Sequence, residues 1–236
     1  MKKIGFTLAE VIITIGIIGV VAAMTIPTLI HRAQNKILEN QTKHFYAMMT
    51  QAFRRYMADE NTETLTLTPL NWNDDISEEE IQEHWDKFIK SYLKVAKECQ
   101  NERDCFSEKV QVLSGGKIEI ESIIYGRKSY ALMNGYTLSV LLFPSYSPGS
   151  LVVDVNGKKG PNISGRDIWF LSIYRDGSLD ESSLTPECKK SSEACIYGGS
   201  VAEVIARRFE TCNGSIWAYG AGCFGRFKAN NFKFDY

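Results

Sequence analysis

The sequence predicts an α+β fold in which one long amino-terminal helix, membrane-spanning at first and amphipathic later, packs on a head with an antiparallel sheet. Three observations predict this class. An almost unbroken apolar run extends from Phe6 to Ile30, an amphipathic helical pattern follows it, and short strand-like segments between glycine and asparagine turns occupy the later part of the chain. We therefore expect three parts, namely a leader at residues 1–5, a helix at 6–58 and a head at 61–236.

The long helix is predicted to continue beyond the apolar run because apolar side chains recur near the helical period as far as Tyr56. At 1.5 Å per residue, a helix from Phe6 to about Ala58 is roughly 80 Å long, whereas the hydrocarbon core of a bilayer is about 30 Å thick. Its later half must therefore pack on the rest of the chain. Gly19 lowers helix propensity and Pro27 removes a helical hydrogen bond, so we expect the helix to bend or melt between them when it leaves a bilayer.

The head is predicted to begin with a second helix. Ser77 and Glu80 form a capping box, in which each side chain can bond a backbone N–H group of the other residue. Apolar residues then recur on one helical face from Ile81 to Ala96, so this helix should end near Lys97. A third helix is predicted from Ser200, which opens a similar box.

Hairpin signals such as Gly115-Gly116 and Asn134-Gly135 separate the strands of the predicted sheet. A last strand is expected from Phe232 to Tyr236, because aromatic and charged residues alternate there. The other predicted strands are 110–113, 117–125, 129–133, 137–143, 151–155 and 168–174.

Charge and motifs narrow the function classes. The formal net charge of -1 provides no general attraction to nucleic acid or anionic lipid, and we interpret the basic places at Arg207-Arg208 and 225–234 as solvated surface rather than a DNA site. No hydrolase, metalloprotease, P-loop or dinucleotide motif occurs, so the sequence does not predict an enzyme or a required cofactor. Lys2 and Lys3 precede the apolar run, which by the positive-inside rule keeps that end cytoplasmic and exports the head.

All six cysteines lie in the predicted head. An even count on an exported domain is typical of disulfides, and the grouping in sequence favours three local pairs among the 15 pairings that six cysteines allow. A metal site is the alternative, but no C-x-x-C motif occurs and no histidine lies near a cysteine pair. The expected pairs are Cys99 with Cys105, Cys188 with Cys195, and Cys212 with Cys223.

Glu10 is the one charged residue inside the apolar run. A charged side chain at the centre of a bilayer costs on the order of 2.5 to 3.5 kcal/mol, and less near a helix end, so such a residue usually has a function. The segment Gly5-Phe6-Thr7-Leu8-Ala9-Glu10-Val11, preceded by two lysines, resembles the processing site of the type IV pilin and pseudopilin superfamily.

The resemblance implies that a prepilin peptidase cuts between Gly5 and Phe6 and methylates the new amino terminus. It also implies that the Glu10 carboxylate of one subunit pairs with the Phe6 ammonium of its neighbour, since removing either partner would leave a buried charge uncompensated. The expected partners are the peptidase, other pilin or pseudopilin subunits, inner-membrane assembly machinery and membrane lipid. The expected location is the bacterial cytoplasmic membrane, with the head in the periplasm or at the cell surface.

The chain would then be a structural subunit of a pilus or of a type II secretion pseudopilus, and the leader does not separate these two. One alternative is a secretory signal peptide cleaved near Val21-Ala22-Ala23, although an acidic residue early in the apolar region does not suit a signal peptide. Another is a membrane-anchored or secreted domain that binds a ligand or catalyses a reaction without polymerising. A deep pocket with convergent titratable residues would favour it.

A second segment, Asp154 to Phe170, resembles a D-x-N-G-x-x-G-P-N-x-x-G-x-D pattern in the heads of pilin-like proteins. In the major pseudopilins a carboxy-terminal loop binds calcium, and this segment offers suitable hard oxygen ligands in Asp154, Asn156, Asn162 and Asp167. The spacing does not fit an EF-hand, and Lys158 and Lys159 would repel a cation. A turn-rich connection without a metal is the alternative.

Overall fold

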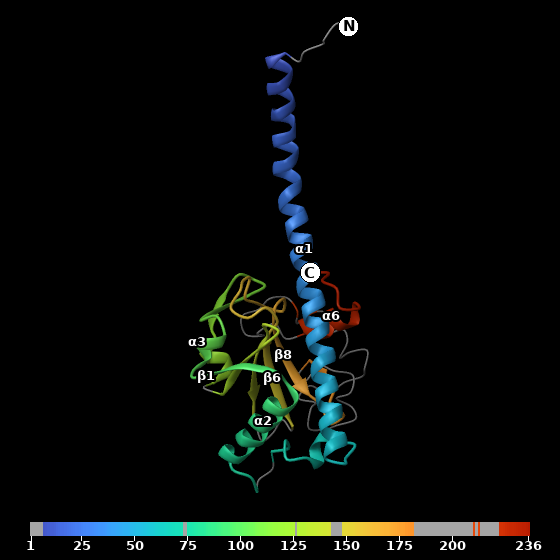
Figure 1. Ribbon diagram of the computed structural model, residues 1–236, viewed down its shortest axis with the longest axis vertical. Helices are drawn as coiled ribbons and strands as arrows, with labels where there is room; N and C mark the ends of the chain where they lie inside the picture. The colour runs from blue at the N-terminus through green and yellow to red at the C-terminus, as the bar shows by residue number, and fades with distance from the viewer. Residues whose placement is uncertain are drawn as a thin grey trace. The chain divides into compact units, whose positions relative to one another are not determined.

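The computed structural model describes residues 7–72, 75–125, 127–142, 148–181, 210, 212 and 222–236. The chain divides into two compact units, Met1–Ile37 and Leu38–Tyr236, and helix α1, Leu8–Asp59, contributes to both (Figure 1). Several features singled out in the sequence lie outside the described residues: the leader, Gly5, Phe6, Cys188, Cys195 and the helix predicted from Ser200.

The long predicted helix is confirmed as α1, whose 52 residues end at Asp59. Its apolar part is exposed, and the helix is long and apolar enough to cross a membrane. α1 runs without interruption through Gly19 and Pro27. The expectation that it loosens between these residues concerns a helix that has left the bilayer, and it stays a prediction.

The head has the predicted α+β character, but its sheet is mixed rather than antiparallel. In the described residues the strand order is β1-β4-β5-β6-β8-β7-β2-β3, and β9 pairs with β8. The two-residue strand β7 runs parallel to both β2 and β8, whereas the other pairs are antiparallel. The strands are β1 Val95–Cys99, β2 Lys109–Val112, β3 Lys117–Glu119, β4 Ser129–Leu132, β5 Thr137–Leu141, β6 Gly149–Asp154, β7 Ile163–Ser164, β8 Ile168–Ile173 and β9 Leu179–Asp180.

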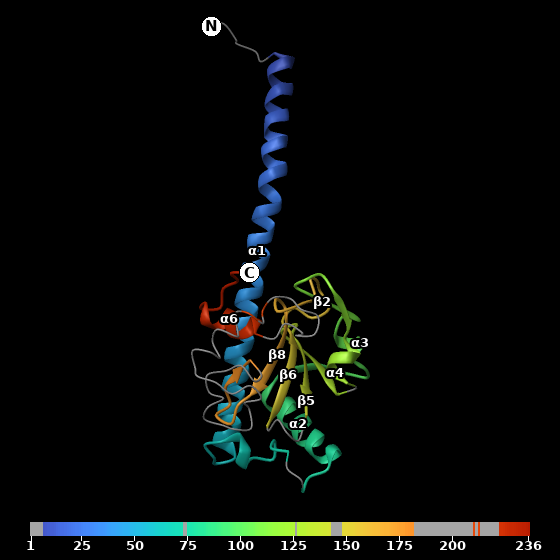
Figure 2. The same cartoon turned by 180° about the vertical axis from the view of Figure 1, so that it is seen from behind.

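The central strands β5, β6 and β8 lie side by side (Figure 2). Their side chains are buried on both faces of the sheet. Burial on both faces explains why apolar residues stand next to one another in these strands, as in Leu151-Val152-Val153, instead of alternating with polar ones. Residues such as Val153 and Leu171 share a core cluster with α1, with α2 (Glu78–Tyr92) and with α6 (Cys223–Ala229). On the other face, Val152 and Ile168 pack with α3 and α4. The short helices are η1 Leu65–Leu67, α3 Glu102–Cys105 and α4 Glu121–Ile124.

The second helix starts where the capping box predicts and ends earlier than expected. The Ser77 hydroxyl accepts a hydrogen bond from the Glu80 N–H, 3.2 Å away. α2 ends at Tyr92, so the predicted extension to Lys97 is wrong. From Val95 onward that extension belongs to β1, which pairs with β4 and leads to the confirmed Cys99–Cys105 disulfide. Pairing with a distant strand outweighs the local helical pattern here.

Two predicted strands are also wrong. In the segment 117–125, β3 stops at Glu119 and the chain turns into α4, because Ile123 and Ile124 are buried in the smaller cluster rather than along a strand edge. At the end of the described chain, α6 is followed by an unpaired tail instead of a strand. The alternation in that tail still has a cause, since Phe232 and Phe234 pack against the core while the charged residues between them face outward.

Candidate metal centre

The candidate centre lies in the connection between β6 and β8. β6 ends at Asp154 and β8 begins at Ile168, and these two residues are register partners. Because the strands are antiparallel neighbours, the two ends of the connection meet, and Asp154 and Asp167 lie close enough for the charge of one to affect the other. The sheet topology therefore brings together the first and last members of the predicted ligand set.

Backbone N–H groups fix both carboxylates. The Asp167 carboxylate accepts hydrogen bonds from the N–H groups of Asn162, at 2.7 Å, and Ile163, at 2.6 Å. The Asp154 Oδ1 atom accepts one from the Asn156 N–H at 3.0 Å. These are the local bonds by which Asp and Asn order turns, and they hold the side chains in place before any ligand binds.

The two amide side chains are fixed through their nitrogen atoms. Asn156 Nδ2 donates to the Gly160 carbonyl oxygen, 3.1 Å away, and Asn162 Nδ2 donates to that of Lys158, 3.5 Å away. Each amide oxygen is thereby left for another partner. The Lys158 and Lys159 side chains, which we expected to oppose a cation, are exposed.

Three buried oxygen atoms of this loop have no hydrogen-bond partner among the described residues: Asp154 Oδ2, Asn156 Oδ1 and Asn162 Oδ1. Asp154 and Asp167 are both 0% exposed. A buried acceptor without a partner costs about 1 to 3 kcal/mol, and more when it is charged. Oxygen atoms in this condition fit a bound cation, which would supply the missing partner.

Burial raises the pKa of Asp154 well above its usual range, and the neighbouring Asp167 carboxylate raises it further. Burial also raises the pKa of Asp167, an effect that the hydrogen bonds from Ile163 and Asn162 partly offset. Two carboxylates in a poorly solvated place resist ionising together. A divalent cation would reverse that preference by neutralising both.

The donor set suits calcium better than a transition metal. It contains only carboxylate and amide oxygens, which are hard ligands of the kind that calcium prefers. The described residues contain no group of three or more His, Cys, Asp and Glu residues placed to hold a metal. The affinity of a calcium site depends on the number of charged ligands, and for two carboxylates we expect a dissociation constant in the range of weak extracellular modules, about 10⁻⁴ to 10⁻³ M.

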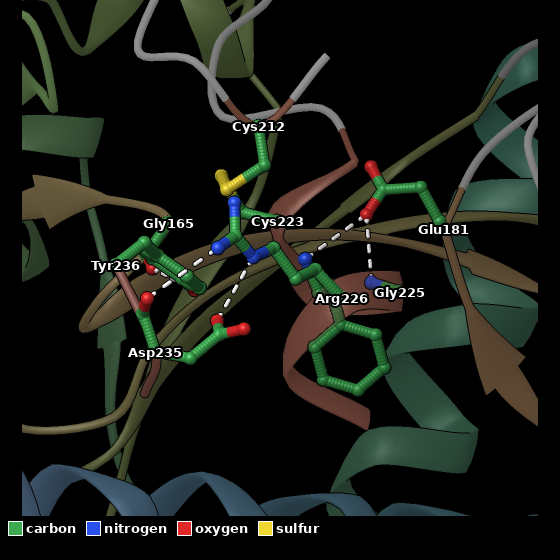
Figure 3. Close-up of a disulfide and its surroundings, with 9 residues drawn as sticks. Gly165, Glu181, Cys212, Cys223, Gly225, Arg226, Asp235 and Tyr236 are labelled. Atoms are coloured by element: carbon green, nitrogen blue, oxygen red, sulfur yellow. Dashed lines mark hydrogen bonds and ion pairs between the residues drawn. A yellow bond between two sulfur atoms is a disulfide. The ribbon is translucent and has the colours of Figure 1, made fainter. Parts of the chain in front are cut away.

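A disulfide and Tyr236, both outside the 154–167 connection in sequence, support this connection (Figure 3). Gly165 has φ +89°, and a Cβ atom there would lie 3.0 Å from Cys223 Sγ. The predicted Cys212–Cys223 disulfide is confirmed and so lies against this glycine. The Tyr236 hydroxyl donates to the Gly165 carbonyl oxygen at 2.8 Å. Sequence inspection missed these supports, because Gly165 and Tyr236 are 71 positions apart.

The same region ties α6 to the end of β9. Glu181 is buried, and its Oε2 atom accepts hydrogen bonds from the N–H groups of Phe224, at 3.1 Å, and Gly225, at 3.2 Å (Figure 3). Lys228 forms an ion pair with Asp180 at 2.7 Å. A buried carboxylate that accepts two N–H bonds holds its element firmly, so α6 gives the disulfide a rigid base.

Glu10 has a local role that sequence inspection missed. Its Oε2 atom accepts hydrogen bonds from the Thr7 N–H, at 2.8 Å, and from the Thr7 hydroxyl, at 2.9 Å, while the Glu10 N–H donates to that hydroxyl at 3.3 Å. Thr7-Leu8-Ala9-Glu10 is therefore a capping box at the start of α1. The spacing of threonine and glutamate was the signal that could have revealed it.

The fold defines a class of protein: an α+β head joined to a long apolar helix that could span a membrane. The chain belongs to a family of unknown function, DUF6613, whose model matches residues 28–176, more than half of the 236 residues. The matched part contains the candidate metal centre. No curated protein and no solved structure matches the chain.

Proposed function

We propose that the protein is a pilin-like structural subunit, a pseudopilin or a minor pilin. After its leader is removed, it would be anchored in a bacterial cytoplasmic membrane by α1, with the head exported, and then assembled through α1 into a pilus or a type II secretion pseudopilus. The observation that carries the proposal is Glu10, a single carboxylate at the start of an exposed apolar helix and within a pilin-like processing segment.

The two parts of α1 differ in burial, as this function requires. In the most apolar stretch of the helix no residue is buried, whereas Phe45, Met49 and Phe53, later in the same helix, belong to the core of the head. A helix segment that is apolar all round needs apolar surroundings. A bilayer supplies them first, and a bundle of identical helices would supply them in a filament.

Glu10 substitutions test the assembly role in cells that make the protein. Glu10→Ala should leave membrane insertion and leader removal intact and reduce the filament-associated fraction, because a neighbouring subunit's ammonium group loses its partner. Thr7→Ala is the matched control, since it removes the hydroxyl that accepts the Glu10 N–H and donates to its carboxylate, and it keeps the carboxylate itself. Equal loss of assembly in both variants would show that Glu10 acts only as a cap, and the proposed pairing would be wrong.

We further propose that the 154–167 connection binds calcium. The three unpartnered buried oxygens support it, together with the raised pKa of both carboxyl groups. Bound calcium would stabilise the head by neutralising Asp154 and Asp167, and the chain's residues would only hold it in place. Calorimetry of calcium binding, on protein freed of metal with a chelator, should show one binding site. If no binding heat is measured and equilibrium dialysis also finds no bound calcium, the proposal is contradicted.

The alternative of an exported binding or catalytic domain has little support in the described residues. A cavity of about 200 Å³ lies between α1 and α2, lined in part by Tyr56, His84 and Phe88. The His84 Nδ1 atom is already 2.9 Å from the Pro69 carbonyl oxygen, a hydrogen-bonding distance. This histidine is better explained as a packing residue than as a base.

A further inference from the structure

An open groove with a positive lining runs beside β1. It measures about 690 Å³, and Arg55 of α1, Lys90 of α2 and Lys94 and Lys97 near β1 contribute its cations, whereas Glu98 is its one carboxylate within the described residues. Lys90 forms ion pairs with Asp86 and Glu98, both at 2.8 Å. The other three cations form no ion pair with a described carboxylate, so the groove keeps a positive charge.

The groove follows an edge of the sheet. β1 is an end strand of the sheet and pairs only with β4 within the described residues. Its middle residues are exposed, and Met133, which also lines the groove, is 72% exposed. Lysines on an edge strand discourage pairing with neutral or basic strands. They favour an acidic partner, and the exposed methionine gives such a partner an apolar contact.

The complementary charge lies at the other end of α2. Glu79, Glu80 and Glu83 are exposed, and no described cation forms an ion pair with them, whereas Glu78 pairs with Arg127. The helix macrodipole accounts for the acidic residues in the first turn of α2. It does not account for the cations of the groove that belong to α1 and β1. The 15 residues of α2 separate its two ends by roughly 21 Å, so one copy cannot bring its own patches together.

We propose that the groove beside β1 receives the acidic start of α2 from a second copy of the chain. This inference rests on the proposed function, because a contact between two different patches repeats from copy to copy and generates a ring or an open filament. Exposed charge pairs contribute orientation more than strength. The packing of α1 would then hold the filament together, while this head contact sets the register of neighbouring subunits.

Charge exchange between the patches provides the test, using the full chain in native membranes. Zero-length carbodiimide coupling, which joins a lysine amine to a carboxylate with loss of water, should link Lys94 or Lys97 to Glu79, Glu80 or Glu83. Mixed isotopically light and heavy copies identify the links between subunits by mass spectrometry.

Three variants separate charge pairing from loss of folding. The link compared among them joins Lys90 in the groove of one copy to Glu83 of another copy, because none of the variants changes these two residues. K94E/K97E and E79K/E80K should each reduce the intersubunit links between the groove and the α2 start by about tenfold or more, and the fourfold exchange should restore them, because the reversed patches again attract. K117E, at an exposed residue of β3 at the opposite end of the sheet from β1, is the control and should leave the wild-type links unchanged.

The outcomes distinguish the two proposals. Processed subunits that form filaments without these links would overturn the head contact and leave the proposed function standing. Chains that are neither processed at Phe6 nor assembled would overturn both. Links that persist unchanged in the two reversed variants would show a contact that does not depend on charge, and this would also overturn the inference.

Discussion

The most informative substitution in the candidate metal centre is Asp154→Asn. The Asp154 side chain is 0% exposed, burial and Asp167 raise its pKa, and one of its oxygens has no partner among the described residues. Asparagine keeps the size and removes the charge. The variant should be more stable than the wild-type chain in chelator at pH 7, and it should lose most of the stabilisation by calcium.

The expected size follows from the contacts and from mass action. Three unpartnered oxygens, at about 1 to 3 kcal/mol each, leave roughly 3 to 9 kcal/mol of unfavourable burial for a cation to relieve. Calcium at about 10 mM, near 100 times a dissociation constant of 10⁻⁴ M, would stabilise the folded state by about 2.7 kcal/mol. For a domain of this size that corresponds to a rise in Tm of roughly 5 to 11 °C.

The sign of the pH dependence follows from the raised pKa of Asp154. Below about pH 3.9, the usual pKa of an aspartate, the carboxyl group is protonated in both the folded and the unfolded chain. As pH rises toward the folded-state pKa, the unfolded chain releases its proton first, so the calcium-free fold loses stability. Calcium replaces the proton, and its stabilising effect should therefore grow from pH 4 to pH 7.

Thermal melts of the detergent-solubilised chain, followed by tryptophan fluorescence in calcium or chelator at several pH values, measure these effects. Asp176→Asn, in the exposed turn before β9, is the matched control and should keep the full calcium response. The reasoning is refuted if Asp154→Asn responds to calcium as the wild-type chain does, or if it is less stable than wild type in chelator at pH 7.

Two further substitutions test the packing around the centre and in the core. Gly165→Ala should lower both the stability of the fold and its calcium affinity, because the new Cβ would lie 3.0 Å from Cys223 Sγ at a φ of +89°. In the control Gly160→Ala, the new Cβ would have nothing within 4 Å, so neither quantity should change. Equal effects in the two variants would contradict the bracing role. Phe53→Ala should lower the free energy of unfolding, measured in urea, by about 3 to 5 kcal/mol, because Phe53 is 0% exposed and its ring stacks on that of Phe88 with centroids 5.1 Å apart. A loss below about 1 kcal/mol would contradict that packing.

Local patterns predicted the long helix well because nothing else competes for its residues. The periodic apolar side chains predicted a helix at 6–58, and α1 covers Leu8–Asp59. Ser77 likewise marked the start of α2, since a capping box is a local interaction. By contrast, β1 depends on pairing with β4, whose residues lie 30 or more positions away, and no local pattern contains that information.

The same distinction explains the candidate centre. Its four predicted ligands are close in sequence, and their oxygen atoms are of the type that suits a hard cation, although their spacing does not fit an EF-hand. The geometry that brings Asp154 to Asp167 comes from the pairing of β6 with β8. The support from Cys223 and Tyr236 was not predictable, because it depends on α6 and the tail, which the sequence pattern wrongly assigned in part to a strand.

The amino terminus of the protein recovered from native membranes tests the central claim most directly. Mass spectrometry should find a methylated Phe6 as the first residue, because the account requires prepilin processing before α1 can assemble. A chain that starts after Ala23 would have lost Glu10 and most of the apolar helix. That result would make the protein a secreted domain and contradict its proposed role as a filament subunit.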